Sequence, residues 1–202
     1  MANLTPVFCR KLFQAGWVAI AAGACLIALT FPARATSVLA PKFEAMVDRA
    51  DLIFAGRVTS QHSEWRDLNG HRAIVTLVTF SVERTHKGRA ESAVTLQFLG
   101  GRVGQVSMDV AEMPQFKAGE RVVLFVEDNG NTASPVIGFF YGRFWLKKDA
   151  AGGDIVLQHD GAPLVDVAEI GGVKSVGGAQ RRALSHEEFA AKVRERLATR
   201  LK

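Results

Sequence analysis

The chain has 202 residues, of which 48% are hydrophobic and 22% are charged. This apolar content excludes a disordered chain, and two cysteines are too few for a disulfide-stabilised scaffold. The length allows one globular domain, or at most two small ones. A formal net charge of +5 suggests nucleic acid or an anionic membrane as a partner only if the charges gather on the folded part.

The first 35 residues have the pattern of a secretory signal peptide. Arg10 and Lys11 precede a mainly apolar stretch over residues 15–31, and Ala33-Arg34-Ala35 follows it. A positive segment, an apolar segment and an A-x-A site together predict export, with cleavage after Ala35.

Two alternatives stay open for this segment. Residues 15–31 could remain as an uncleaved membrane anchor, although this stretch is short for a span, which needs about 20 residues. Lipoprotein processing at Cys25 is the other alternative, but it would leave the apolar residues 26–31 at the mature N-terminus. We expect a periplasmic or secreted protein, with anchoring through residues 15–31 as the alternative.

Removal of the signal changes the composition. Both cysteines, Cys9 and Cys25, lie within the first 35 residues, so the remaining 167 residues could form no disulfide, cysteine nucleophile or cysteine-ligated metal site. The remaining charge is 22 basic against 20 acidic residues, and the basic excess lies in residues 181–202. Nucleic acid is therefore not expected as a partner.

The segment after the signal predicts a short helix followed by a β-hairpin. Phe43, Met46, Val47 and Ala50 recur at helical spacing. Two β-rich runs, residues 52–59 and 72–84, then flank the dipeptide Asn69-Gly70, a strong hairpin signal because both residues tolerate positive φ.

Further short strands are predicted down to residue 158. They are expected near Val94–Phe98, Val106–Val110, Arg121–Glu127, Val136–Leu146 and Asp154–Gln158. Short strands at this spacing are typical of an antiparallel sandwich or small barrel, and we favour the barrel. The predicted fold class is thus mainly β: a small antiparallel OB-like β-barrel with a short N-terminal helix and an amphipathic C-terminal helix.

The predicted domains are a signal peptide (1–35), a β-barrel domain with its N-terminal helix (36–165), a mobile glycine-rich connector (166–183) and a C-terminal helix (184–202). Ser185 and Glu188 form a capping box at the start of this last helix. Its apolar stripe is expected to dock on the barrel, with contact to a membrane surface or a partner as the alternative. Membrane contact is otherwise expected only through an uncleaved signal.

Catalytic motifs are scarce in the sequence. It has no G-x-S-x-G elbow, S-x-x-K motif, Walker loop or G-x-G-x-x-G motif. His186-Glu187 begins an H-E-x-x-H pattern, but Ala190 stands where the second histidine is needed. We therefore expect no cofactor.

Metal and ligand candidates come from polar and aromatic residues. His62, Asp67 and His71 lie near the predicted hairpin turn and could share a metal ion if the strands bring them together, although solvated loop residues are the simpler interpretation. The aromatic run around Tyr141, with Arg143 inside it, could stack bases on an oligonucleotide-binding barrel. Core packing is the simpler interpretation of that run.

The sequence resembles a group of exported bacterial proteins of uncharacterised function. The resemblance rests on Ala50–Val58 (ADLIFAGRV), on a strand that ends in Lys87-Gly88, and on Met113–Phe125, which contains P-x-F-x-x-G-E-R. It implies a five-stranded oligonucleotide/oligosaccharide-binding (OB) barrel, similar in outline to the netrin-like domain of tissue inhibitors of metalloproteinases. Those inhibitors chelate zinc through an N-terminal cysteine, whereas this mature chain would begin at Thr36, so their function does not transfer.

The expected function is that of an exported, non-enzymatic binding or accessory domain of the bacterial cell envelope, holding a protein or glycan on one rim of the barrel. The rim would include Trp65, Asn69-Gly70, residues 100–104 with Arg102, and residues 129–134, and we add Tyr141 and Arg143 as candidate ligand contacts. The alternatives are a metal-assisted hydrolase that uses His62, His71 and Asp67, or a partner or inhibitor of an exported protease. Whether the protein is an enzyme stays open.

Overall fold

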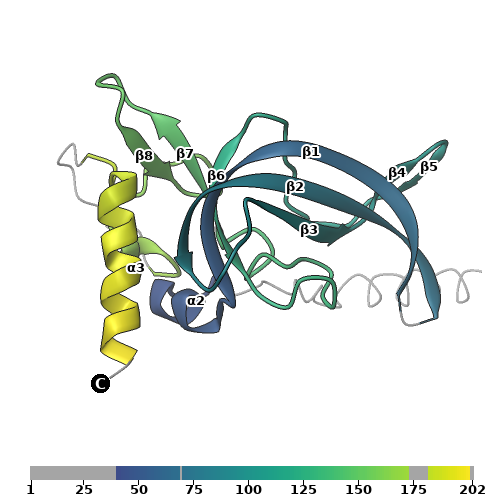
Figure 1. Ribbon diagram of the computed structural model, residues 1–202, viewed down its shortest axis with the longest axis horizontal. Coiled ribbons are helices and arrows are strands. Elements are labelled where there is room, and N and C mark those ends of the chain that lie inside the picture. The colour runs from purple at the N-terminus through teal and green to yellow at the C-terminus, as the bar shows by residue number, and fades with distance from the viewer. Residues whose placement is uncertain (1–39, 69, 173–181, 201–202) are drawn as a thin grey trace, which may run out of the picture. The chain divides into compact units, whose positions relative to one another are not determined.

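A computed structural model describes residues 40–68, 70–172 and 182–200. The described residues belong to one compact unit. The predicted signal peptide and Asn69 lie outside the described residues. The fold is mainly β, with an antiparallel sheet and two α-helices, as the sequence predicts (Figure 1).

The sheet has six strands in the order β3-β2-β1-β6-β7-β8. Its strands are β1 (Leu52–Leu68), β2 (His71–Lys87), β3 (Ala93–Leu99), β6 (Arg121–Val126), β7 (Arg143–Lys148) and β8 (Asp154–Leu157). A separate two-stranded sheet pairs β4 (Gly101–Val103) with β5 (Val106–Met108). The helices are α2 (Phe43–Arg49) and α3 (His186–Arg200), with a short 3-10 helix at Val167–Glu169.

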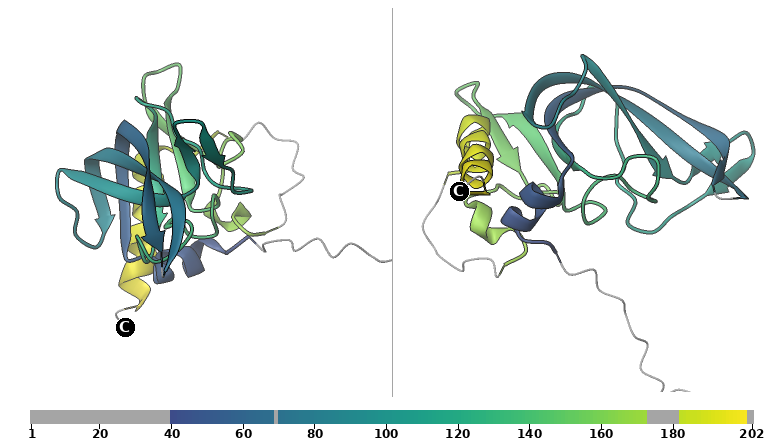
Figure 2. Two further views of the ribbon diagram at one scale, coloured as in Figure 1. Left: turned by 90° about the vertical axis from the view of Figure 1, so that its right-hand side faces the viewer. Right: turned by 60° about the horizontal axis from the view of Figure 1, so that its bottom comes forward.

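The β1–β2 hairpin is longer than predicted and strongly curved (Figures 1 and 2). Residues 60–68, expected to be a polar connection, continue β1 and pair with β2 as far as Leu68 opposite His71. The register shifts at three places along β1, and such bulges bend a strand. Gly56 permits close packing at one of them, since a Cβ there would lie 2.7 Å from the Ser81 carbonyl oxygen.

Two further predictions are wrong in detail. Residues 137–142 form turns rather than the first half of a strand, and Val136 makes only an isolated bridge to Val126. The strand itself is Arg143–Lys148, of which Trp145–Lys148 pairs with β8. Residues 166–172 are not a mobile connector, because Val167 and Ile170 are buried in the core around the 3-10 helix. The remainder of the predicted connector, residues 173–181, lies outside the described residues.

The central strands bury both faces, because alternate residues of β1 and β6 enter two different hydrophobic clusters. One cluster joins Phe125 to α2 and α3 through Phe43, Phe189 and Val193. The other cluster lies inside the curve of the sheet and includes Phe54, Phe80, Leu96, Phe98, Phe116 and Leu124. We call these the helix-side core and the inner core.

The outer edge of β3 pairs with a loop rather than with a strand. The Leu99 amide donates to the Ala133 carbonyl over 2.8 Å, and Asn129 bonds to the backbone of Gln97 and Thr95. Residues 129–133 thus satisfy backbone groups that an edge strand would otherwise leave exposed. Among the described residues, no helix is long and apolar enough to cross a membrane.

Candidate functional site

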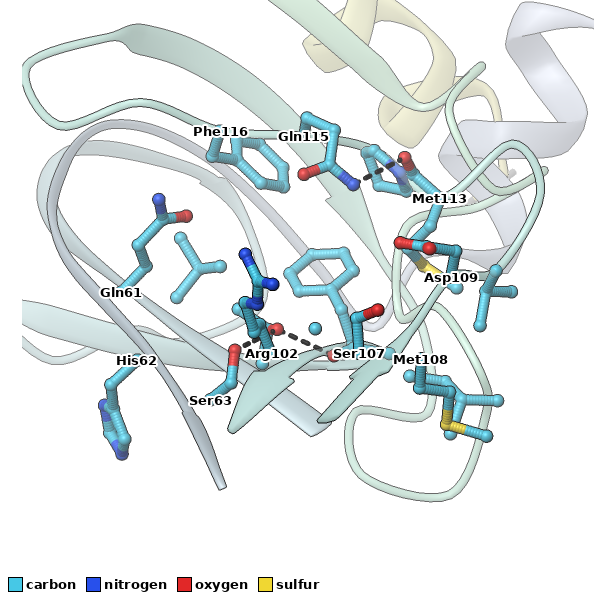
Figure 3. A pocket seen from close by; sticks show the side chains of 18 residues that line it. Gln61, His62, Ser63, Arg102, Ser107, Met108, Asp109, Met113, Gln115 and Phe116 are labelled. Atoms are coloured by element: carbon cyan, nitrogen blue, oxygen red, sulfur yellow. Dashed lines mark hydrogen bonds between the residues drawn. The ribbon is translucent and has the colours of Figure 1, made fainter. Parts of the chain in front are cut away.

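An open cleft of about 680 Å³ lies inside the curve of the sheet (Figure 3). The buried side chains of Val78, Phe98 and Phe116 line its apolar part. The other walls come from β1, from β4–β5 and from the loop that contains Met113 and Gln115. The volume lies within the range of about 300–1,000 Å³ that is typical of small-molecule sites.

Hydrogen bonds fix β4 against the hairpin at one wall of the cleft. The Thr76 hydroxyl donates to the Gly100 carbonyl over 2.7 Å, and the Ser63 and Thr76 hydroxyl oxygens are 2.9 Å apart. Because the Thr76 proton is already used, Ser63 donates to Thr76. Gly101 has a φ of +130°, and a Cβ at Gly101 would lie 2.2 Å from Thr76 Oγ1, so a glycine is needed for this approach.

The polar side chains that face the cleft are mostly uncharged. Gln61 and Gln115 are exposed, and Ser107 is exposed on β5. Arg102 points into the cleft and Asp109 lies at its side (Figure 3). The cleft therefore offers amide and hydroxyl groups, with one guanidinium, one carboxylate and the imidazole of His62.

Arg143 does not line this cleft but supports it from behind. Its guanidinium lies 4.4 Å from the Trp145 ring centroid and 5.5 Å from that of Phe116. Nη1 donates to the Gln115 carbonyl over 2.7 Å, whereas the buried Nε has no hydrogen-bond partner among the described residues. Burial lowers the pKa of Arg143. Arg143 thus positions the loop that carries Gln115 and Phe116.

The structure does not bring the metal candidates together. His62 pairs with Leu77 and His71 pairs with Leu68, which places the two histidines six pairs apart, or about 20 Å along the strand. Of the three candidates, only His62 is among the residues that line the cleft. No group of three His, Cys, Asp or Glu side chains in the described ranges could hold a metal ion.

The remaining predicted contacts are dispersed. Trp65 is exposed near the far end of β1 and lies under Arg72, with the guanidinium 4.8 Å from the ring. Tyr141 packs against Phe140 and His159 and lines a smaller pocket of about 340 Å³. Of the predicted rim residues that the structure describes, Gly100, Gly101 and Arg102 line the larger cleft.

No family model, curated protein or solved structure matches this chain. The resemblance drawn from the sequence therefore stays a prediction.

Sequence reasoning missed most of the cleft-lining residues. Gln61, Ser63 and Thr76 carry no motif, and Met113 and Gln115 lie in the segment that carries the resemblance but were not predicted as contacts. These residues meet only because β1 curves and the chain after β3 folds back over it. The adjacent glycines at 100 and 101 were the available signal, since paired glycines in a strand pattern indicate a close backbone approach.

Proposed function

We propose that this protein is an exported, non-enzymatic binding domain of the bacterial cell envelope whose cleft holds a glycan. The observation that carries the proposal is the cleft of about 680 Å³, in which amide and hydroxyl side chains stand over an apolar floor. The export part of the proposal rests on the signal-like pattern of residues 1–35.

The chemistry of the walls suits a sugar better than a strongly charged ligand. Gln61, Ser107 and Gln115 can each donate and accept hydrogen bonds, which matches the two-way hydrogen bonding of sugar hydroxyls. Arg102 and Asp109 balance each other in charge. The apolar floor provides a surface for the C–H face of a sugar ring.

We further propose that the sheet is an OB-like barrel. The support is the curvature of β1 and β2, the pairing of β6 with the free edge of β1, and the loop at residues 129–133, which covers the edge of β3. OB-folds bind oligosaccharides on one strand face and its adjoining loops, and the cleft is likewise lined by strands and a loop.

A protein segment is the second candidate ligand. Val106 and Met108 on β5 are 50% and 37% exposed, and β5 pairs only with β4 among the described strands. An extended peptide could add to this edge as a further strand. The hydrolase alternative gains no support from the positions of His62 and His71.

The proposal is tested by calorimetric titration with a panel of neutral oligosaccharides, which includes the tetramer of N-acetylglucosamine. We expect one member of the panel to bind and Gln61→Ala or Gln115→Ala to weaken binding about threefold to tenfold, since a hydrogen bond is worth about 0.5–1.5 kcal/mol.

The matched control is His71→Ala, an exposed change at the hairpin turn outside the cleft, which should leave affinity unchanged. If no oligosaccharide binds, or if all three variants bind equally, the glycan proposal is wrong. Binding of an extended peptide that Met108→Asp abolishes would support the second candidate.

A further inference from the structure

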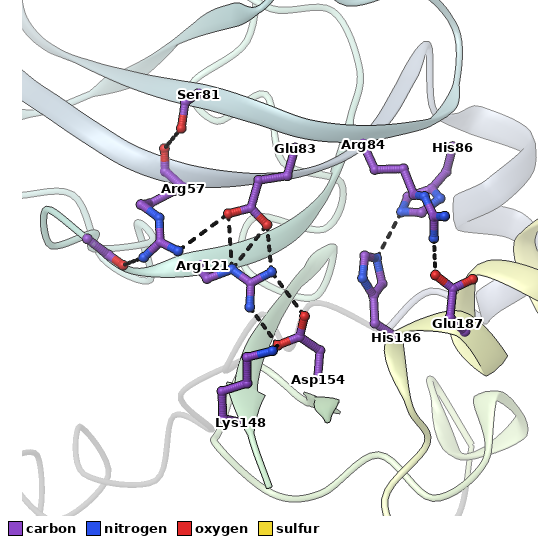
Figure 4. A network of polar contacts seen from close by, with 11 residues as sticks. Arg57, Ser81, Glu83, Arg84, His86, Arg121, Lys148, Asp154, His186 and Glu187 are labelled. Carbon is purple, nitrogen blue, oxygen red and sulfur yellow. Dashed lines mark hydrogen bonds and ion pairs between the residues drawn. The ribbon is translucent and has the colours of Figure 1, made fainter. Parts of the chain in front are cut away.

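Two histidines far apart in the sequence meet where α3 joins the sheet. His86 lies near the end of β2 and His186 is the first residue of α3. Their Nε2 atoms are 3.1 Å apart, whereas the ring centroids are 5.2 Å apart, so the two Nε2 atoms lie between the rings and face each other (Figure 4). This arrangement fits an N–H···N hydrogen bond.

Such a hydrogen bond depends on the protonation of both rings. With both rings neutral, one Nε2 donates and the other accepts. One added proton still leaves an acceptor, but two added protons turn both atoms into donors that carry like charges. When both rings are protonated, the hydrogen bond is therefore lost and the two positive charges repel each other.

The surroundings oppose protonation. Both side chains are partly buried, and burial is the main cause that lowers the pKa of His86 to about 4 and lowers the pKa of His186. A positive charge on His186 is also disfavoured by its position at the N-terminus of a helix.

Charged groups from four elements face the pair. Arg84 on β2, Arg194 on α3 and Arg121 on β6 lower the histidine pKa values, whereas Glu187 on α3 and Asp154 on β8 raise them. Arg84 pairs with Glu187, and Arg121 pairs with Asp154 and Glu83, so the two acids are already neutralised (Figure 4). The net effect of these charges therefore disfavours protonation of either histidine.

We propose that His86 and His186 form an acid-sensitive clasp, which holds the start of α3 on β2 at neutral pH and loosens it in acid. The clasp acts where the helix begins, next to the backbone bridge between Ser185 and Ile155. Further along α3, buried Phe189 and Val193 and the ion pair between Arg196 and Asp48 hold the helix independently. Acid therefore loosens the first turns of α3 before the rest.

Two measurements on the full chain test the clasp. The first follows the imidazole resonances of the unaltered protein by NMR from pH 8 to pH 4. We expect His86 and His186 to titrate below pH 6.5, the ordinary value for histidine. Titration of both near pH 6.5 would overturn the proposal.

The second measurement is hydrogen exchange of the α3 amides, expressed as protection factors at pH 7 and pH 4.5. A docked histidine titrates near pH 4, and a released one near pH 6.5. From this difference we expect protection at the start of α3 to fall about 10- to 100-fold between pH 7 and pH 4.5. In H86Q/H186Q, whose side chains do not titrate, this fall should vanish. The control H62Q/H71Q should keep it.

An unchanged fall in H86Q/H186Q, or equal protection at both pH values in the unaltered chain, would overturn the clasp. Neither result depends on whether the cleft binds a glycan.

Discussion

The two faces of the sheet are completed in different ways. On one face, α2 and α3 cover the helix-side core, where Phe43, Phe125 and Phe189 form edge-to-face ring contacts. On the inner face, loops and β4–β5 provide partial cover and leave the cleft open. Helices close a face with regular side-chain packing, whereas loops leave polar groups and space. We therefore infer that the helix side contributes most of the stability and that the inner face binds the ligand.

The largest effect is expected from a cavity in the helix-side core. Phe189→Ala removes a fully buried ring that contacts Phe43, Phe125 and Phe144, and should lower the free energy of unfolding by about 3–5 kcal/mol. Phe116→Ala, beside the open cleft, should cost roughly 1 kcal/mol less, because water can fill the space. Urea unfolding of both variants measures the difference. Equal losses would contradict the contrast between the faces.

Acid should weaken the helix side next. Burial lowers the pKa of His86 to about 4, so its neutral form is favoured in the fold. The corresponding stability is fully present above about pH 6.5 and is lost as the pH falls towards 4, by roughly 2–3 kcal/mol. Arg121 lowers the pKa of Asp154 to about 2, which adds a second loss between about pH 4 and pH 2. Denaturant unfolding at pH 7, 5 and 3 checks both stages, and a free energy that is flat from pH 7 to 5 contradicts the first.

The Arg121 network should contribute somewhat less. Arg121 bridges Glu83 and Asp154 with its side chain only 19% exposed, so Arg121→Gln leaves two acids without their main partner. We expect a loss of about 1–3 kcal/mol. The matched control is Lys192→Gln, which removes an exposed ion pair with Glu195 on α3 and should cost less than about 0.5 kcal/mol. Similar losses in the two variants would show that the network adds no stability of its own.

On the inner face, a glycine substitution should lower both stability and ligand binding. Gly101→Ala combines a positive φ with a Cβ that would meet Thr76 and Ser63, and we expect about 1–2 kcal/mol of destabilisation together with loss of ligand binding. Gly104→Ala is the control, because a Cβ there meets nothing within 4 Å. Thermal unfolding and calorimetric titration of both variants measure the two effects. Full affinity in Gly101→Ala would contradict the placement of the site.

The smallest effect on stability is expected at the mouth of the cleft. Arg102 is exposed and has no ion pair among the described residues, so Arg102→Ala should change the free energy of unfolding by less than about 0.5 kcal/mol. Ligand affinity should nevertheless fall, since the side chain points into the cleft. An unaltered affinity would place the ligand elsewhere.

Periodicity and turn signals in the sequence predict much of the fold. The stripe of Phe43, Met46 and Val47 predicts α2, which the structure confirms, and the capping box of Ser185 and Glu188 marks the start of α3 through reciprocal hydrogen bonds. Residues 60–68 were missed as a strand because both faces there are polar, which leaves no alternation to detect.

The cleft and the histidine pair could not be predicted from the sequence for a different reason. Both depend on contacts between distant segments: Ser63 with Thr76 and Gly101, and His86 with His186 across 100 residues. No local pattern encodes the curvature that brings the cleft residues together. His62 and His71 are separated because β1 continues to Leu68, which places the two histidines six residue pairs apart along the hairpin.

Amide chemical shifts of the purified protein, recorded with and without an oligosaccharide that binds, test the central assignment of binding to the inner face most directly. We expect shifts at the cleft, in β1 around Gln61 and Ser63, in β4–β5 and in the loop that carries Gln115, with the helix-side core unchanged. Shifts confined to α2, α3 or the residues packed beneath them would contradict it.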